Sequence, residues 1–159
     1  MTGLRHHLAV LVWILASLAM TGCAGWIRSD TTKLDLRMTA GADLNPDLSG
    51  RPSPVVIRIF ELKAPSLFAN ADFVALYEYT QDTLGVDLVR SEELVLAPGE
   101  SRHFKYALAP ETNFVGVMAA YRDISQANWR QILPVAAGER NKAQLIMDAR
   151  GISAVGAGQ

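Results

Sequence analysis

The stretch that decides the fold is residues 32–62, TKLDLRMTAGADLNPDLSGRPSPVVIRIFEL. Near its start, the apolar side chains Leu34, Leu36 and Met38 alternate with charged ones, which predicts a β-strand with one buried face. Its final segment, VVIRIFEL at 55–62, is largely apolar on both faces and predicts a strand in the centre of a sheet. The stretch therefore indicates a domain built on β-structure.

Residues 41–54, GADLNPDLSGRPSP, connect these two strands. Proline and glycine recur along the segment, so neither a helix nor a strand can run through most of it. A hairpin needs only about 2–5 loop residues, and loops that exceed the required length are often functional. Leu44 and Leu48 lie on either side of Pro46, and two interpretations stay open. Either the proline-stiffened backbone presents both leucines to a partner, or both pack back onto the core and the loop is a spacer.

A short helical insertion is expected after the second strand. Asp72 is placed to cap a helix through residues 73–77, and residues 81–87 indicate a turn region. Further strands are expected at 88–96, 102–108, 113–121, 129–135 and 142–148. Turn signals at this spacing predict an all-β fold, an antiparallel β-sandwich over residues 32–150. Residues 151–159 are small and are expected to form a flexible tail.

The first residues of the chain have the pattern of an export signal. Arg5 is followed by an apolar run, Leu8 to Met20, that only Ser17 interrupts. A helix over that run would reach about 20 Å at ~1.5 Å per residue, short of the roughly 30 Å of a bilayer core. A cleaved signal peptide over residues 1–22 is therefore the better interpretation.

Cys23 is the only cysteine of the chain and stands where the apolar run ends. With Gly22 and Ala24 beside it, the segment resembles the lipobox of bacterial lipoproteins, in which the cysteine becomes a lipid thioether. That resemblance implies an acyl anchor on Cys23, a tether over residues 23–31 and, because Ala24 is not aspartate, the outer membrane facing the periplasm. The alternative is a buried or free thiol. With one cysteine an intrachain disulfide is impossible.

Composition limits the function further. Without residues 1–22 the chain has 14 basic and 16 acidic side chains, because only Arg5 leaves with the signal. A net charge of −2 excludes a general nucleic-acid binder. The remaining length is enough for one domain with a proper core.

The sequence offers little for catalysis. His103 alternates with an apolar neighbour and is expected to face solvent, and no cluster of Cys, His or carboxylate residues has the spacing of a metal site. Glu92 and Glu93 are adjacent on a strand and point to opposite faces, so they cannot act as a pair. Arg122 and Asp123 are expected to form a structural ion pair. We therefore expect a binding protein, with no metal, no cofactor and no enzymatic activity.

Several segments together resemble the TssJ family, the outer-membrane lipoproteins of the type VI secretion system. These segments are LNPDLSGRPSPVVIRIFEL at 44–62, ADFVALYE at 71–78, LAPGE at 96–100 and VGVMAAYRD at 115–123, with Trp129 following. They occur in the family's order and, with the lipobox, cover nearly the whole chain after the signal.

The resemblance implies a transthyretin-like β-sandwich with a small helical addition and a non-enzymatic role. In that family the lipoprotein binds the periplasmic C-terminal region of the inner-membrane protein TssM, through the loop between the first two strands, and helps build the membrane complex. That loop corresponds to residues 41–54, and the candidate contacts are Leu44, Asn45, Pro46, Asp47, Leu48 and Arg51. Leu44→Asp or Leu48→Asp is then expected to abolish TssM binding and to leave folding intact.

The competing function is a periplasmic lipoprotein whose sandwich binds a small ligand or a polysaccharide. Such a protein needs a concave apolar pocket with a few converging polar groups. The aromatic side chains that could line one are Tyr77, Tyr79, Tyr121 and Trp129.

Overall fold

The computed structural model describes residues 31–156. The predicted signal peptide (1–22), Cys23 and the tether up to residue 30 lie outside the described residues, as do residues 157–159. Within the described part of the chain, no helix has the length and apolar character needed to cross a membrane.

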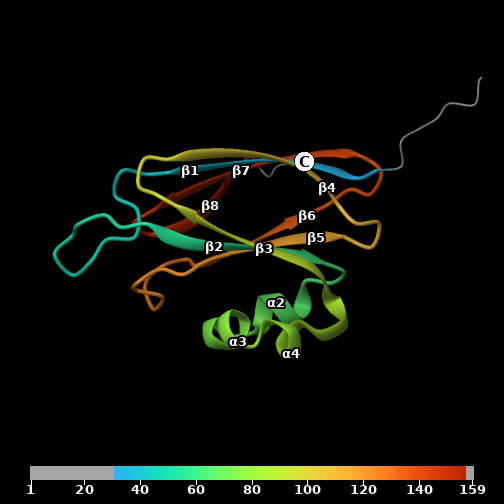
Figure 1. Ribbon diagram of the computed structural model, residues 1–159, viewed down its shortest axis with the longest axis horizontal. Coiled ribbons are helices and arrows are strands. Elements are labelled where there is room, and N and C mark those ends of the chain that lie inside the picture. Colours follow the sequence, from blue (N-terminus) through green and yellow to red (C-terminus); the bar gives the residue numbers. More distant parts are fainter. Residues whose placement is uncertain (1–30, 157–159) are drawn as a thin grey trace, which may run out of the picture.

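In residues 31–156, eight strands form two four-stranded sheets that pack face to face (Figure 1). The first sheet has the order β4-β1-β7-β8 and the second has the order β3-β2-β5-β6. The strands are β1 (Lys33–Ala40), β2 (Val55–Leu62), β3 (Leu88–Leu96), β4 (Ser101–Ala107), β5 (Phe114–Ala119), β6 (Arg130–Pro134), β7 (Arg140–Asp148) and β8 (Gly151–Val155). The predicted β-sandwich is confirmed.

Pairing within the sheets is antiparallel except between β1 and β7, which run parallel. β2 lies in the centre of its sheet, as its two apolar faces predict, and β6, which ends at Pro134, lies at the edge. β1 and β2 belong to different sheets. Residues 41–54 therefore cross from one sheet to the other and are not a hairpin loop.

The alternating side chains of β1 explain the main core. Leu34, Leu36 and Met38 are buried against the second sheet, while the charged residues between them face outward. β2 contributes Val55, Ile57 and Ile59 from the other side. A continuous apolar layer between the sheets is what holds two such sheets together, because each fully buried aliphatic side chain contributes about 1.5–3 kcal/mol.

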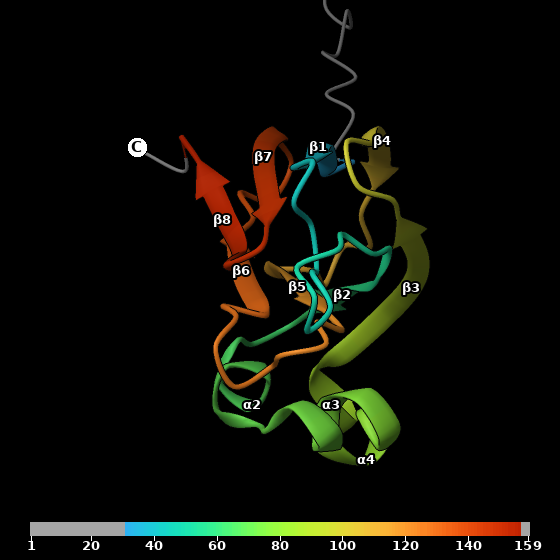
Figure 2. The same ribbon diagram turned by 90° about the vertical axis from the view of Figure 1, so that its left-hand side faces the viewer.

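The helical insertion covers the outer face of the second sheet, as Figures 1 and 2 show. It consists of α2 (Ser66–Asn70), α3 (Phe73–Glu78), α4 (Thr80–Leu84) and the 3-10 turn η1 (Gly85–Asp87). Asp72 caps α3 as predicted, since its side chain accepts a hydrogen bond from the Ala75 backbone N–H at 2.8 Å. The prediction of a mere turn at 81–87 is wrong, because Leu84 packs into the insertion's core and stabilises α4.

A second, smaller core joins this insertion to the sheet. The buried residues are Phe60, Leu62, Phe68, Leu76, Leu84 and Met118. Gly116 on β5 makes room for the ring of Phe68, because a Cβ at position 116 would lie 2.9 Å from Phe68 Cζ. The two apolar faces of β2 are therefore buried by different partners, one by the opposite sheet and the other by the helices.

The prediction of a flexible tail from residue 151 is wrong for residues 151–155. These residues form β8, which pairs antiparallel with β7 and buries Ile152 in the main core. The strand is short and rich in small side chains, so its sequence has little of the alternation that marks the other strands.

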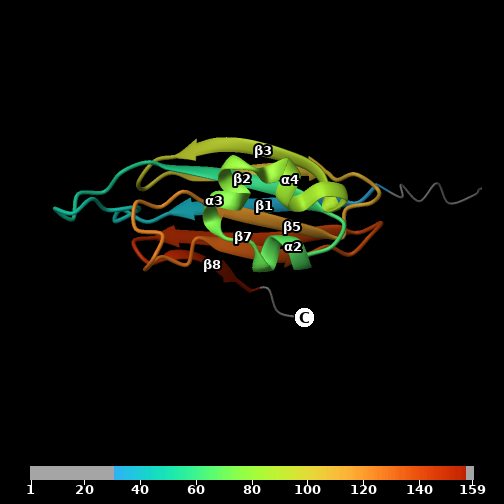
Figure 3. The same cartoon turned by 90° about the horizontal axis from the view of Figure 1, so that it is seen from below.

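The start of β1 and the 41–54 loop lie at opposite ends of the sandwich. β1 begins at the end where the described chain starts, and residues 41–54 extend beyond the strands at the other end (Figures 1 and 3). The loop is thus the part of the domain that lies far from its entry point.

Candidate functional site

The 41–54 loop is fixed where it leaves β1. The Gly41 backbone N–H donates to the carbonyl of Met147 at 2.7 Å, and the Gly41 carbonyl accepts from the Gly99 N–H at 3.1 Å. The first residue of the loop is therefore held between the end of β7 and the β3–β4 turn.

Leu44 anchors the loop in the main core. Its side chain is fully buried, and its carbonyl accepts a hydrogen bond from the Ser53 N–H at 2.9 Å, which draws the two arms of the loop together. The expectation that Leu44→Asp would leave folding intact is wrong, because the substitution would place a charge among apolar side chains. Of the two open interpretations, the core-packing one holds for Leu44.

Asn45 is also part of the scaffold. It is 4% exposed and has a φ of +47°, a backbone conformation that asparagine tolerates better than most residues. Its Nδ2 donates to the Pro54 carbonyl at 2.8 Å, and its Oδ1 accepts from the Arg122 backbone N–H at 2.8 Å. One buried amide thus closes the base of the loop and joins it to a second segment of the chain.

Beyond this base, residues 46–51 form a tip that is held by its own hydrogen bonds. Asp47 Oδ1 accepts from the backbone N–H groups of Ser49 at 2.9 Å and Arg51 at 3.0 Å, and Asp47 Oδ2 accepts from Arg51 Nε at 3.1 Å. The backbone hydrogen bond from Arg51 is the largest of the effects that hold the pKa of Asp47 below its ordinary value, and it outweighs desolvation. The tip is therefore organised around an ionised carboxylate.

Leu48 belongs to that tip. Its side chain is fully exposed, unlike that of Leu44. The Asp47 carboxylate orders the backbone of the tip, and Leu48 is its one exposed large apolar side chain. For Leu48, the interpretation that it packs back onto the core is wrong, because its side chain is exposed.

A second loop, residues 120–129, faces the first. The Asp123 carbonyl accepts from the Ala127 N–H at 3.0 Å, and its side chain accepts from the Ser125 hydroxyl at 2.6 Å. Arg122 forms no ion pair with Asp123 or any other carboxylate of the described residues, so the expected structural ion pair is absent there. Ile124 is partly exposed on the same loop.

The two loops enclose a groove of about 650 Å³. One wall comes from residues 45–49, and Ala149 contributes from the β7–β8 turn. The other wall is formed by Tyr121, Arg122, Asp123, Gln126 and Ala127. Figure 2 views the domain from this end and shows the 41–54 loop in front of both sheets. Of the six sequence-predicted contacts, Leu44 and Asn45 form the base of the loop, and Pro46, Asp47, Leu48 and Arg51 form its tip.

The facing loop was not among the predicted site residues. For this segment the sequence predicts only an ion pair between Arg122 and Asp123. What the sequence could not indicate is that Asn45 would bind this loop across 76 intervening residues.

The backbone of Gly151 packs closely against Asn128, near the end of the facing loop, and holds that end in place. Asn128 N–H donates to the Arg150 carbonyl at 2.9 Å, and the Ile152 N–H donates to the Asn128 carbonyl at 2.7 Å. A Cβ at Gly151 would lie 2.4 Å from the Asn128 oxygen, so only glycine fits here. The start of β8 therefore helps to position the groove.

In the described residues, the side chains considered for catalysis or metal binding do not come together in one site. His103 is exposed, as expected, and its Nε2 lies 2.5 Å from Asp35 Oδ1. Among residues 31–156 no group of three His, Cys, Asp or Glu side chains could hold a metal ion.

The four aromatic residues of the ligand-binding alternative do not converge. Tyr77 and Trp129 both pack against Phe73 of the helical insertion, with ring centroids 5.4 and 5.3 Å away. Tyr79 is exposed, whereas Tyr121 lies in the main core, where burial raises the pKa of its hydroxyl. Only Tyr121 lines the groove.

The described residues thus form a β-sandwich with a self-supported loop at one end. Residues 32–150 match the family described as type VI secretion lipoprotein, VasD, EvfM, TssJ, VC_A0113. The chain belongs to this family, and the predicted resemblance is confirmed.

Solved structures of type VI secretion proteins are similar to this chain as well. The type VI secretion lipoprotein TssJ1 from Pseudomonas aeruginosa is 37% identical, with a TM-score of 0.77, over 79% of this chain and 95% of that chain. A chain of a type VI membrane complex is 25% identical, with a TM-score of 0.69, over 79% of this chain and 98% of the other. A chain in the structure of the TssM C-terminal domain from EAEC is 24% identical, with a TM-score of 0.66, over 78% of this chain and 98% of the other. It has the same fold. No curated protein matches this chain.

Proposed function

We propose that this chain is a non-enzymatic lipoprotein of the outer membrane that binds the periplasmic C-terminal region of TssM and helps assemble the type VI secretion membrane complex. Membership of the secretion lipoprotein family supports this role. The similarity to a chain of a type VI membrane complex supports it further.

The proposed anchor is an acyl group on Cys23, at the junction after the apolar signal. Two or three acyl chains hold a protein on a membrane almost indefinitely, whereas one is marginal. Ala24 favours the outer membrane, with the domain in the periplasm on a tether over residues 23–31.

The proposed TssM site is the loop tip and the groove beside it. The observation that carries this assignment is the contrast between two leucines four residues apart, of which Leu44 is fully buried and Leu48 fully exposed. The backbone that carries Leu48 is already ordered by Asp47, so the tip loses little backbone conformational entropy on binding. We assign direct contact to Pro46, Asp47, Leu48 and Arg51, and a supporting role to Leu44 and Asn45.

The position of the loop suits a protein that joins two membranes. The domain's entry point lies at one end of the sandwich and the loop at the other (Figure 3). A tether at the first end leaves the loop pointing away from the anchor and free to meet a partner from the inner membrane.

Calorimetric titration against the periplasmic C-terminal fragment of TssM from the same genome tests this proposal. The chain from residue 24 is suitable, because all described strands and both cores lie within residues 32–155 and the similar Pseudomonas chain is matched over 95% of its length. The variants are Leu48→Asp and, as a matched control, Val86→Asp. Val86 is also an exposed apolar residue but belongs to the helical insertion.

We expect saturable one-to-one binding that Leu48→Asp weakens at least about thirtyfold, since a central hot-spot residue contributes about 2 kcal/mol or more. Val86→Asp should bind like the unchanged chain. No binding by the unchanged chain, with both proteins folded, would refute the proposed partner; equal binding by both variants would refute the site.

A further inference from the structure

The outer face of the first sheet carries an unusual concentration of positive charge. Because Leu34, Leu36 and Met38 point into the core, the alternate residues of β1 point outward, and the paired strands place their own outward residues beside them. We call this surface the basic face. Its cations are Lys33, Arg37, Lys105, Arg140 and Lys142, all exposed.

The strand register brings these cations into adjacent rows. Lys33 is paired with Arg140 across β1 and β7. Two residues further on, Asp35 lies between Lys105 of β4 and Lys142 of β7.

The next rows are less charged. Arg37 is paired with His103 and Gln144, and the row closest to the 41–54 loop holds Thr39, Ser101 and Ile146, which carry no charge. The positive charge is therefore densest at the end where β1 begins and is absent next to the loop.

Only one carboxylate, that of Asp35, belongs to these rows. Asp35 pairs with His103, and none of the five cations forms an ion pair in the part of the chain that the structure describes. In the rows from Lys33 to Arg37, five cations against one carboxylate give a formal charge of +4, with His103 neutral, on a chain whose overall charge is −1. The other outward carboxylate of β7, Asp148, lies at the loop end of the sheet and pairs with Arg150. Repulsion among these unpaired cations costs stability, and an anionic partner bound to this face would relieve it.

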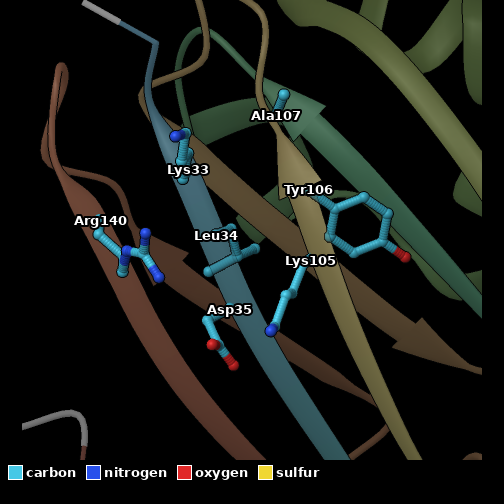
Figure 4. Close-up of a pocket in the computed structure, with 7 residues that line it drawn as sticks. All are labelled: Lys33, Leu34, Asp35, Lys105, Tyr106, Ala107 and Arg140. Carbon is cyan, nitrogen blue, oxygen red and sulfur yellow. The ribbon is translucent and has the colours of Figure 1, made fainter. Parts of the chain in front are cut away.

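A hollow of about 390 Å³ lies at the charged end of this face. Figure 4 shows Asp35 between Arg140 and Lys105, with Lys33 nearer the start of β1 and Tyr106 pointing away from these groups. The helices cover the opposite sheet, so they leave this surface open (Figures 1 and 2).

We propose that the basic face binds the anionic phospholipid surface of the membrane to which the domain is tethered, with the β1 start against the headgroups and the 41–54 loop raised away from them. Residues 24–32 can span at most about 32 Å at ~3.5 Å per residue, so a tether at Cys23 keeps Lys33 close to that membrane. Each Lys or Arg near an anionic membrane strengthens association several-fold, within a Debye length of about 8–10 Å.

This inference uses the proposed anchor only for the location of the domain, and it can be tested without lipidation. The single cysteine allows the chain from residue 23 to be coupled through its thiol to maleimide-phosphatidylethanolamine in vesicles. The vesicles contain either phosphatidylcholine alone or phosphatidylcholine with 30% phosphatidylglycerol as the probe.

The readout is the acetylation rate of each lysine, measured by mass spectrometry. Three of the chain's four lysines lie on the basic face, and the fourth, Lys63, is exposed beside the helical insertion and serves as an internal control. On the anionic vesicles we expect acetylation of Lys33, Lys105 and Lys142 to slow at least about threefold relative to neutral vesicles. Lys63 should react equally on both, and 0.5 M salt should remove the protection.

A pair of charge-matched double variants gives the control. Lys105→Gln with Lys142→Gln should remove most of the protection of Lys33, whereas Lys63→Gln with Arg150→Gln should preserve it. Equal lysine reactivity on the two vesicle types, or protection that both double variants keep, would overturn the inference. Either failure would leave the TssM titration unaffected, since that experiment contains no membrane.

Discussion

The side-chain oxygen of Asn45 accepts a hydrogen bond from the backbone N–H of Arg122 at 2.8 Å. This contact joins the two loops that form the groove, while the other end of the same amide donates to Pro54. A residue that is itself almost inaccessible thus determines how the exposed tip is held.

Asn45→Ala removes both hydrogen bonds and leaves the partly buried Arg122 N–H and Pro54 carbonyl without these partners. We expect the free energy of unfolding to fall by about 1–3 kcal/mol. Hydrogen exchange at the Arg122 amide should accelerate and TssM affinity should decrease. Asn70→Ala, which removes an exposed hydrogen bond on α2, is the control and should change stability little. Unchanged exchange at Arg122 would contradict the assigned role of Asn45.

Leu44 and Leu48 should separate stability from binding. Leu44→Ala creates a cavity in the main core and is expected to cost about 2–5 kcal/mol in urea unfolding. Leu48→Ala removes a side chain that touches little, so its effect on unfolding should stay within about 0.5 kcal/mol while TssM affinity drops. If the two variants unfold alike, the distinction between core anchor and contact residue is incorrect.

Gly151→Ala should weaken the groove from its far side. The residue has a φ of +126°, and a Cβ would lie 2.4 Å from the Asn128 carbonyl oxygen. We expect a loss of at least about 2 kcal/mol beyond that of Gly50→Ala, a control with positive φ but no neighbouring atom within 4 Å. Thermal unfolding of both variants measures the difference, and similar melting temperatures would argue against the close packing of β8.

Cys23→Ser tests the proposed anchor. Without the thiol no thioether can form, so we expect a folded domain that leaves the outer-membrane fraction and appears in the periplasmic fraction. The secretion complex should fail to assemble in these cells. Recovery of the variant in the outer-membrane fraction would count against lipidation at this position.

Alternation in the sequence predicted individual strands well. At β1 and β7 every second side chain is apolar, and burying that face stabilises a strand whatever its neighbour is. Alternation does not indicate which strands pair, so the parallel contact between β1 and β7 could not be predicted. β8 escaped prediction because Gly151–Val155 is dominated by small residues.

The sequence predicted which loop forms the candidate site, but not which of its side chains are buried and which are exposed. The prolines and glycines of residues 41–54 identify an irregular segment, yet such a segment has no period from which buried and exposed positions could be assigned. Leu44 and Leu48 therefore looked equivalent. Contacts far along the chain, such as the one from Asn45 to Arg122, decide which of them is buried.

The most direct test of the central claim is site-specific photo-crosslinking in cells that produce the whole secretion complex. A benzoylphenylalanine replaces Leu48 at the loop tip or Val86 on the helical insertion, both of which are exposed apolar positions. We predict a crosslink to TssM from position 48 and none from position 86. A crosslink to TssM from position 86 alone would contradict the assignment of the 41–54 loop as the binding site.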